Sequence, residues 1–234
     1  MKILLTFFVF ISLFSSAQEK ELKDITSYPN QTLIVNWSYN SFLNNTDDLK
    51  VSPLSTGVDI YLMQTLAGKD NFLSLAIGGG ISVQNIKSNS YLVSTDSSFF
   101  NSISKDLKYS KSKVSTVFLD LPIEIRLRSR PKPKDKAGIV RKRNFKFAIG
   151  FKIGYNFQRY IKYEGEDYRA HNYGNNVKFK EYNLDNILLY RYGVYSTVGI
   201  GNFSLYAYYA LTEFFENKKG PQLRPFSVGI SIQI

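Results

Sequence analysis

Strict two-residue alternation over long segments constrains the fold of this chain more than any other feature of its sequence. In residues 226–234 every even position is apolar and every odd position is small or polar, and residues 145–157 and 117–128 alternate just as regularly. Because successive side chains of a β-strand point to opposite faces, each segment predicts a strand with one apolar and one polar face. Residues 73–84 predict a further strand of this kind.

Weaker alternation predicts four more strands, at residues 32–40, 55–65, 187–199 and 202–212. Several of the eight segments exceed ten residues, which is longer than the usual strand of a globular domain and suits a tilted strand that crosses a membrane. After residue 17 no apolar run approaches the length of a membrane-spanning helix. The segments therefore favour a sheet of about eight strands over any helical membrane protein.

The connections between these segments alternate in length. The long polar ones are residues 41–53, 87–113, 161–185 and 213–224, and the tight ones are 66–71 and 200–201, with 130–143 as an exception. Long loops on one rim and short turns on the other are typical of outer-membrane barrels. The expected fold class is all-β: an up-and-down antiparallel transmembrane β-barrel of about eight strands with long extracellular loops.

The N-terminus has the pattern of a secretory signal peptide. Lys2 precedes an apolar run from Ile3 to Phe14, and small residues at 15–17 suit cleavage before Gln18. A retained amphipathic anchor is the alternative. The expected domains are a signal peptide at 1–17, a periplasmic segment at 18–31 and an outer-membrane barrel at 32–234, which places the protein in a bacterial outer membrane.

Composition narrows the possible chemistry. The chain has no cysteine, so it has neither disulfides nor thiolate sites, and its net charge of +11 would suit nucleic acid in another compartment. An export signal argues against nucleic acid and favours anionic lipid headgroups or sugars. The 17 tyrosines and 18 phenylalanines suit a barrel with aromatic girdles.

The polar faces decide which way the strands point. They carry eight charged residues, Asp59, Asp120, Glu124, Arg126, Arg128, Lys146, Lys152 and Arg191. The bulky strand at 117–128 is expected between strands with small residues, Ala76, Gly78, Gly80 and Ser82 on one side and Ala148, Gly150 and Gly154 on the other. Large side chains against small ones fill a narrow lumen. A soluble lipocalin-like barrel, with its apolar faces inward, is the main alternative.

An aromatic girdle is expected on the outward face near the outer ends of the strands. Its predicted members are Trp37, Tyr39, Tyr155, Phe157, Tyr190, Tyr192, Tyr209 and Phe226. Tyrosine and tryptophan gather at membrane–water interfaces, so outer-membrane lipid is an expected partner.

No candidate catalytic, cofactor-binding or metal-binding residue is found. Asp120 and Glu124 lie about 13 Å apart along one strand, too far to act together on a glycosidic bond. The expected role of the eight charges is a network of buried ion pairs that closes the lumen. The single histidine, His171, is expected in a loop, where alone it cannot build a metal site. The chain is therefore predicted not to be an enzyme and to need no cofactor.

Two further features leave alternatives open. The expected periplasmic turn carries Arg130, Lys132, Lys134, Lys136, Arg141, Lys142 and Arg143, and is either a solubilising hairpin tip or a docking strip for an anionic partner. The outer loops carry Tyr91, Phe99, Phe100, Tyr109, Tyr163, Tyr168, Tyr173, Phe179 and Tyr182. These aromatic residues either contact a ligand or pack on one another.

Three stretches resemble the PorT-like family of outer-membrane β-barrels: residues 118–126, 149–155, and 199–209 with 225–230. The resemblance covers the second half of the chain well and the first half only by pattern. It implies an integral outer-membrane barrel, in some members serving secretion or assembly machinery, and it brings no catalytic residues.

The expected function is therefore a structural or accessory subunit of an outer-membrane assembly, non-catalytic and with a closed lumen, which has protein partners. The alternatives are a stand-alone surface binding protein that uses its extracellular loops, then a lipid-modifying enzyme or a small pore.

Overall fold

The computed structural model describes residues 30–44, 49–68, 71–94, 96–129, 145–168, 172–182 and 184–234. The signal peptide predicted at 1–17 and most of the segment 18–31 lie outside these residues. The described strands are β1 (Gln31–Leu43), β2 (Thr56–Ala67), β3 (Leu73–Lys87), β4 (Ser90–Ser94), β5 (Ser98–Ser102), β6 (Tyr109–Arg128), β7 (Phe145–Asp167), β8 (Asn172–Tyr182), β9 (Tyr190–Ile200), β10 (Phe203–Ala210) and β11 (Arg224–Gln233).

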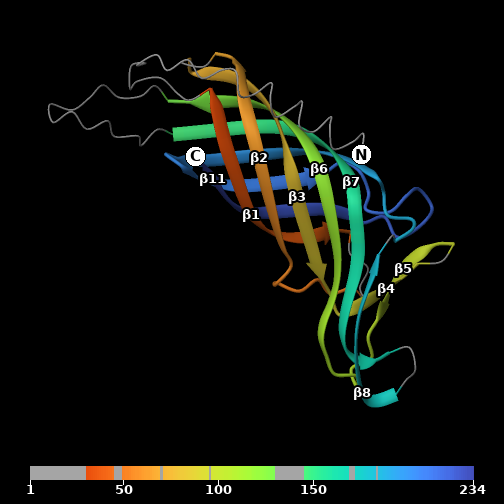
Figure 1. Ribbon diagram of the computed structural model, residues 1–234. Coiled ribbons are helices and arrows are strands. Elements are labelled where there is room, and N and C mark those ends of the chain that lie inside the picture. The colour runs from red at the N-terminus through yellow and green to blue at the C-terminus, as the bar shows by residue number, and fades with distance from the viewer. Residues whose placement is uncertain are drawn as a thin grey trace, which may run out of the picture.

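Eight of these strands close into a ring. The order around it is β1, β2, β3, β6, β7, β9, β10 and β11, and β11 pairs again with β1, with every neighbouring pair antiparallel (Figure 1). All eight correspond to strands predicted from the alternation, so the all-β, antiparallel prediction is confirmed. Within the described residues there is no helix with the length and apolar character that crossing a membrane requires.

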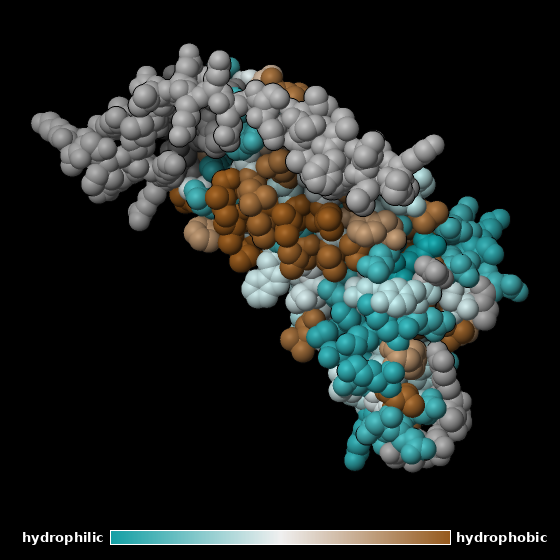
Figure 2. All heavy atoms as spheres, viewed as in Figure 1, coloured by the Kyte–Doolittle hydropathy of each residue, from teal (hydrophilic) through white to brown (hydrophobic). Residues whose placement is uncertain are grey.

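The alternation of the sequence becomes an alternation of exposure. Along β6 the odd-numbered residues of its second half are exposed, Leu121 at 60 % and Leu119 at 50 %, while Asp120 between them is fully buried. Apolar side chains thus face outward and polar side chains face the interior of the ring. Figure 2 shows the apolar residues gathered over the ring and the hydrophilic ones beyond it.

The short turn between β9 and β10 matches its predicted chemistry. Gly201 has a φ of 63°, in the left-handed region that glycine adopts at little cost. Gly68, after β2, has a φ of 70° for the same reason.

The prediction that residues 87–113 and 161–185 are loops is wrong over much of their length. β6 begins at Tyr109 and β7 runs to Asp167, and beyond the ring β8 pairs with β7 while β4 and β5 form a separate hairpin. In Figure 1 these strands project from one end of the ring. We call β4, β5, β8 and the adjoining ends of β6 and β7 the protrusion.

A β-bulge explains why the alternation did not reveal the whole of β7. Val117 pairs with Gln158 and Phe118 pairs with Asn156, so Phe157 has no partner on β6. An extra residue in one strand reverses which positions face outward. Before the bulge the odd-numbered residues of β7 are exposed, whereas after it Ile161 and Tyr163 are buried.

An apolar cluster fills the end of the ring from which the protrusion extends. It consists of Phe42, Leu49, Ile86, Leu92, Val114, Ile161, Leu184, Ile187, Phe214, Phe215 and Leu223. The members come from the ends of four ring strands and from the four long connections, including residues 49, 92, 184 and 214. We call this cluster the cap, after its place at this rim of the ring.

Candidate functional site

Four buried charges from four different strands meet in the middle of the ring. They are Asp59 on β2, Asp120 on β6, Lys152 on β7 and Arg191 on β9, each at most 5 % exposed. The two carboxylates balance the two cations, so this central ion cluster has a formal charge of zero. Buried charges persist only when they are paired and hydrogen-bonded, and the geometry meets this condition.

Asp120 accepts hydrogen bonds from three strands. Arg191 Nη2 lies 2.7 Å from its Oδ2 and 3.1 Å from its Oδ1. The hydroxyls of Tyr61 and Ser82 each donate to Oδ2 at 2.7 Å. The Arg191 guanidinium also stacks 3.6 Å from the ring centroid of Phe118. Asp120 is thus the acceptor that ties β2, β3 and β9 to β6.

Lys152 lies between the two carboxylates of the cluster, Asp59 and Asp120. Its ammonium donates to the hydroxyl of Tyr61 at 2.9 Å and of Tyr206 at 3.2 Å, and lies 3.4 Å from Asp59 Oδ2. It also lies 4.1 Å from the ring centroid of Tyr208, a cation–π contact. Tyr206 in turn donates to Asp59 at 3.0 Å, so the interior is cross-linked from wall to wall.

Small residues opposite these charges make the arrangement possible. Asp120 pairs with Gly80 on β3 and Gly154 on β7, and a Cβ at Gly154 would stand 2.1 Å from Asp120 Oδ1. Glu124 pairs with Ala76 and Gly150. The predicted setting of large side chains between small-residue neighbours is confirmed by this register.

The remaining predicted charges lie nearer the other rim. Glu124 contacts Nε of Arg126 and accepts a hydrogen bond of 2.9 Å from Tyr195. Arg128 is buried, whereas Lys146 is half-buried and donates to Gln233 at 3.4 Å. All eight predicted charges thus point into the ring, but only four of them form the central ion cluster.

The cap and the central ion cluster leave little space between them. A cavity of about 20 Å³ separates Arg191 and Phe118 from Ile187 and Phe214 of the cap, room for roughly one water molecule. The interior is therefore packed across at this level. The four charges of the central ion cluster contact one another directly below the cap.

The predicted girdle residues all lie on the outer wall. Trp37 and Tyr190 are 59 % and 62 % exposed, and Tyr155 and Tyr190 are cross-strand partners with ring centroids 5.4 Å apart. Tyr209 and Phe226 likewise pair directly across β10 and β11. Tyr39, Phe157 and Tyr192 face outward as well. The seven basic residues predicted at 130–143, and His171, lie outside the described residues.

Several aromatic residues of the predicted loops pack on one another. Tyr91 stacks on Tyr168 with ring centroids 3.9 Å apart, and Tyr163 is fully buried with Phe179 against it. Phe100 packs on the cap. Phe99, Tyr109 and Tyr182 remain exposed, although one face of Tyr109 lies against Tyr163 and one face of Tyr182 against Tyr160. Mutual packing therefore accounts for the first group and leaves the second on the surface.

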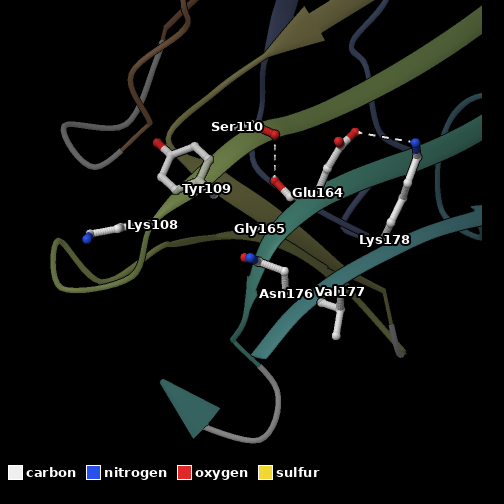
Figure 3. Close-up of a pocket in the computed structure, with 8 residues that line it drawn as sticks. All are labelled: Lys108, Tyr109, Ser110, Glu164, Gly165, Asn176, Val177 and Lys178. Carbon is white, nitrogen blue, oxygen red and sulfur yellow. Dashed lines mark hydrogen bonds and ion pairs between the residues drawn. The ribbon is translucent and has the colours of Figure 1, made fainter. Parts of the chain in front are cut away.

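The protrusion also carries an open depression of about 530 Å³, shown in Figure 3. It is lined by Lys108, Tyr109, Ser110, Glu164, Gly165, Asn176, Val177 and Lys178. Lys178 Nζ lies 3.8 Å from Glu164, and the Ser110 hydroxyl donates to the Glu164 carbonyl at 3.2 Å. The Ser110 hydroxyl thus donates to a carbonyl oxygen, and none of the described residues that line the depression is a histidine. The described residues also contain no group of three or more His, Cys, Asp or Glu that could hold a metal.

Comparison with known proteins gives no relative: no protein-family model, no curated protein and no solved structure matches this chain. The resemblance to the PorT-like family therefore stays a prediction that rests on the residues named above.

Sequence reasoning did not predict the hydrogen bonds of Tyr61, Ser82 and Tyr206 to the charges, and it missed the whole cap. Tyr61 shares the inward face of Asp59, two residues along β2, and Ser82 and Tyr206 also lie on predicted inward faces. Their odd or even positions along the predicted strands place them on the inward face, and this could have indicated that they contact the buried charges. The cap had no such signal, because its residues are scattered through connections without periodicity.

Proposed function

We propose that this protein is an integral outer-membrane β-barrel with a closed lumen that acts as a structural or accessory subunit of an outer-membrane assembly. One observation supports this most: the outward wall of the ring is apolar on every strand. Examples from different strands are Leu62, Ile81, Leu121, Ile153, Val198, Leu205 and Ile230, each at least 39 % exposed.

The height of this wall suits a bilayer. On β6 the outward residues are apolar from Val117 to Leu127, ten residue steps that span about 33 Å along the strand. A strand tilted by roughly 40° then crosses a band about 25 Å thick, the usual apolar height of an outer-membrane barrel. A soluble barrel would turn these side chains inward and its charges outward, the reverse of the arrangement here.

The packed side chains of the interior support a non-conducting role. The cap and the central ion cluster lie one after the other along the interior of the ring, and this arrangement supports a lumen that does not conduct ions. The accessory role also draws on the PorT-like resemblance and on the protrusion, which offers contact surface beyond the wall.

The first test is electrical. Inserted in planar bilayers, the purified protein is expected to show no steady conductance at moderate voltages, because the cap and the ion cluster obstruct the lumen. An open porin in the same bilayers serves as the positive control. A stable open channel of the wild-type protein would contradict the closed lumen.

The second test concerns partners and uses the absence of cysteine, which makes an introduced cysteine unique. Tyr109→Cys on the protrusion and Asn202→Cys at the opposite rim are both exposed positions for a photo-activated cross-linker. An accessory subunit is expected to give one reproducible protein adduct at one of the two positions and to co-purify with that protein in mild detergent, as read by mass spectrometry.

The matched cysteine variants control for cross-linking at random. A protein that purifies alone, with no adduct at either position, would contradict the accessory role. That outcome would favour the second candidate, a stand-alone surface binder, for which the open depression on the protrusion is the supporting observation.

A further inference from the structure

Four lysines form a straight row across adjacent strands. Lys87 on β3 pairs with Lys113 on β6, Lys113 pairs with Lys162 on β7, and Lys162 pairs with Lys180 on β8. Because neighbouring strands lie about 4.8 Å apart, the row extends roughly 14 Å across the sheet. We call these four residues the lysine row.

The lysine row lies on the outward face, above the apolar wall. On β3 the outward positions run from Val83 through Asn85 to Lys87, and on β6 from Val117 through Ser115 to Lys113. The four residue steps from Val83 to Lys87 cover about 13 Å of strand, or roughly 10 Å of height after tilt. In a bilayer this is the depth of the headgroups, just outside the hydrocarbon.

No lysine of the row is paired across the strands with an acidic residue. Among the described residues none of the four forms an ion pair, whereas Lys111 and Lys178, one step higher, share Glu164 at 3.9 and 3.8 Å. Like charges directly opposite each other destabilise a sheet. Partial burial lowers the pKa of Lys113, and Lys162 and Lys87 lower it further against the opposing effect of Tyr160.

Neutral groups hold the row in place without neutralising it. Lys113 donates to Asn85 Oδ1 at 2.8 Å, and Lys180 Nζ lies 3.8 Å from the ring centroid of Tyr160 and 4.5 Å from that of Tyr182. These contacts position two of the four ammonium groups near the top of the wall. The row is thus a positioned, uncompensated band of positive charge.

We propose that the lysine row binds the phosphate groups of anionic lipid headgroups in the leaflet at this rim. The proposal rests on the proposed membrane barrel and adds a specific lipid chemistry to it. Phosphates bridging neighbouring ammonium groups relieve the repulsion along the row. The tyrosines beneath it, Tyr160 and Tyr182, offer amphipathic rings at the boundary with the acyl chains.

The test is a titration with lipid A that carries two phosphates, in a nonionic detergent, followed by native mass spectrometry. The variant Lys113→Gln/Lys162→Gln is expected to bind roughly 30-fold more weakly than the wild type, since each lysine near an anionic surface contributes about a factor of five. Glutamine is one chain atom shorter than lysine but keeps an uncharged nitrogen donor, so we expect folding to be preserved. The control Lys111→Gln/Lys178→Gln removes the same charge from ion-paired lysines and is expected to change binding less than about threefold.

Separate readouts distinguish the possible failures. Equal weakening in both double variants, or no weakening in either, would overturn the lysine row as the site. Binding of inorganic phosphate at the same affinity as lipid A would overturn a lipid as its ligand. Insertion into phosphatidylcholine vesicles is measured independently, and a wild-type protein that fails to insert there contradicts the membrane barrel itself.

Discussion

Replacing Asp120 with asparagine is expected to lower the free energy of unfolding by about 3–5 kcal/mol, because it leaves an uncompensated buried cation. Asparagine keeps the shape of the side chain but removes the charge that faces Arg191 at 2.7 Å and Lys152 at 3.7 Å. Only Asp59 then remains for two buried cations. Urea titration of the protein folded into phosphatidylcholine vesicles measures the change.

A double variant separates charge imbalance from lost packing. Asp120→Asn/Arg191→Met restores the balance of charge, because Lys152 then faces Asp59 as one buried cation and one buried anion. Methionine is expected to retain the contact with Phe118. Its loss in the free energy of unfolding, for the double variant, is expected to be about 1–3 kcal/mol smaller than the sum of the losses in the two single variants. Glu164→Gln, at an exposed ion pair, is the control and should cost less than about 1 kcal/mol. Additive single effects would show that Asp120 and Arg191 are not energetically coupled.

The substitution Ile123→Arg is expected to destabilise the inserted protein by about 2–4 kcal/mol, the cost of an arginine on the lipid face at the middle of a membrane. Ile123 faces outward near the centre of the apolar stretch of β6 and is 45 % exposed. On a water-exposed surface the same change would fall within about 0.5 kcal/mol. The measurement is the fraction of folded protein recovered from vesicles as urea is raised.

Phe99→Arg is the matched control, because Phe99 is 46 % exposed but lies on β5 in the protrusion. It is expected to leave insertion and stability within about 0.5 kcal/mol of the wild type. If both arginine variants behave alike and remain stable in detergent-free buffer, the outward wall faces water and the membrane proposal fails.

The partition between the two faces of the ring was predictable because it depends only on parity. An unbroken period of two assigned Asp120 and Leu121 to opposite faces. The neighbours of each ring strand followed from pairing the predicted strands in chain order. The large-against-small pairing followed from the same reasoning. Where every strand has one apolar face, an eight-membered ring is a direct way to leave none of its edges open.

The strands could not be predicted beyond the point where the two-residue alternation is interrupted. Phe157 and Gln158 both face outward, so the bulge makes the sequence after it read as irregular. β8 adds a second difficulty, since Asn175, Asn176 and Lys178 resemble a polar loop and gain their strand from pairing with β7. The cap required knowledge of which connections meet in space, and local pattern contains no such information.

Ring closure has a consequence for the time course of folding. Ile34 pairs with Gln233 and Leu43 with Arg224, so the seam joins strands at opposite ends of the described chain. Such non-local contacts form slowly, since the entropy of closing a long loop is lost before any contact compensates for it. Until β11 reaches β1, two strand edges stay unpaired and the apolar wall stays unshielded, a state prone to aggregation. We therefore expect the protein to need a holding chaperone before insertion, and to fold in a late, concerted step in which seam and interior form together.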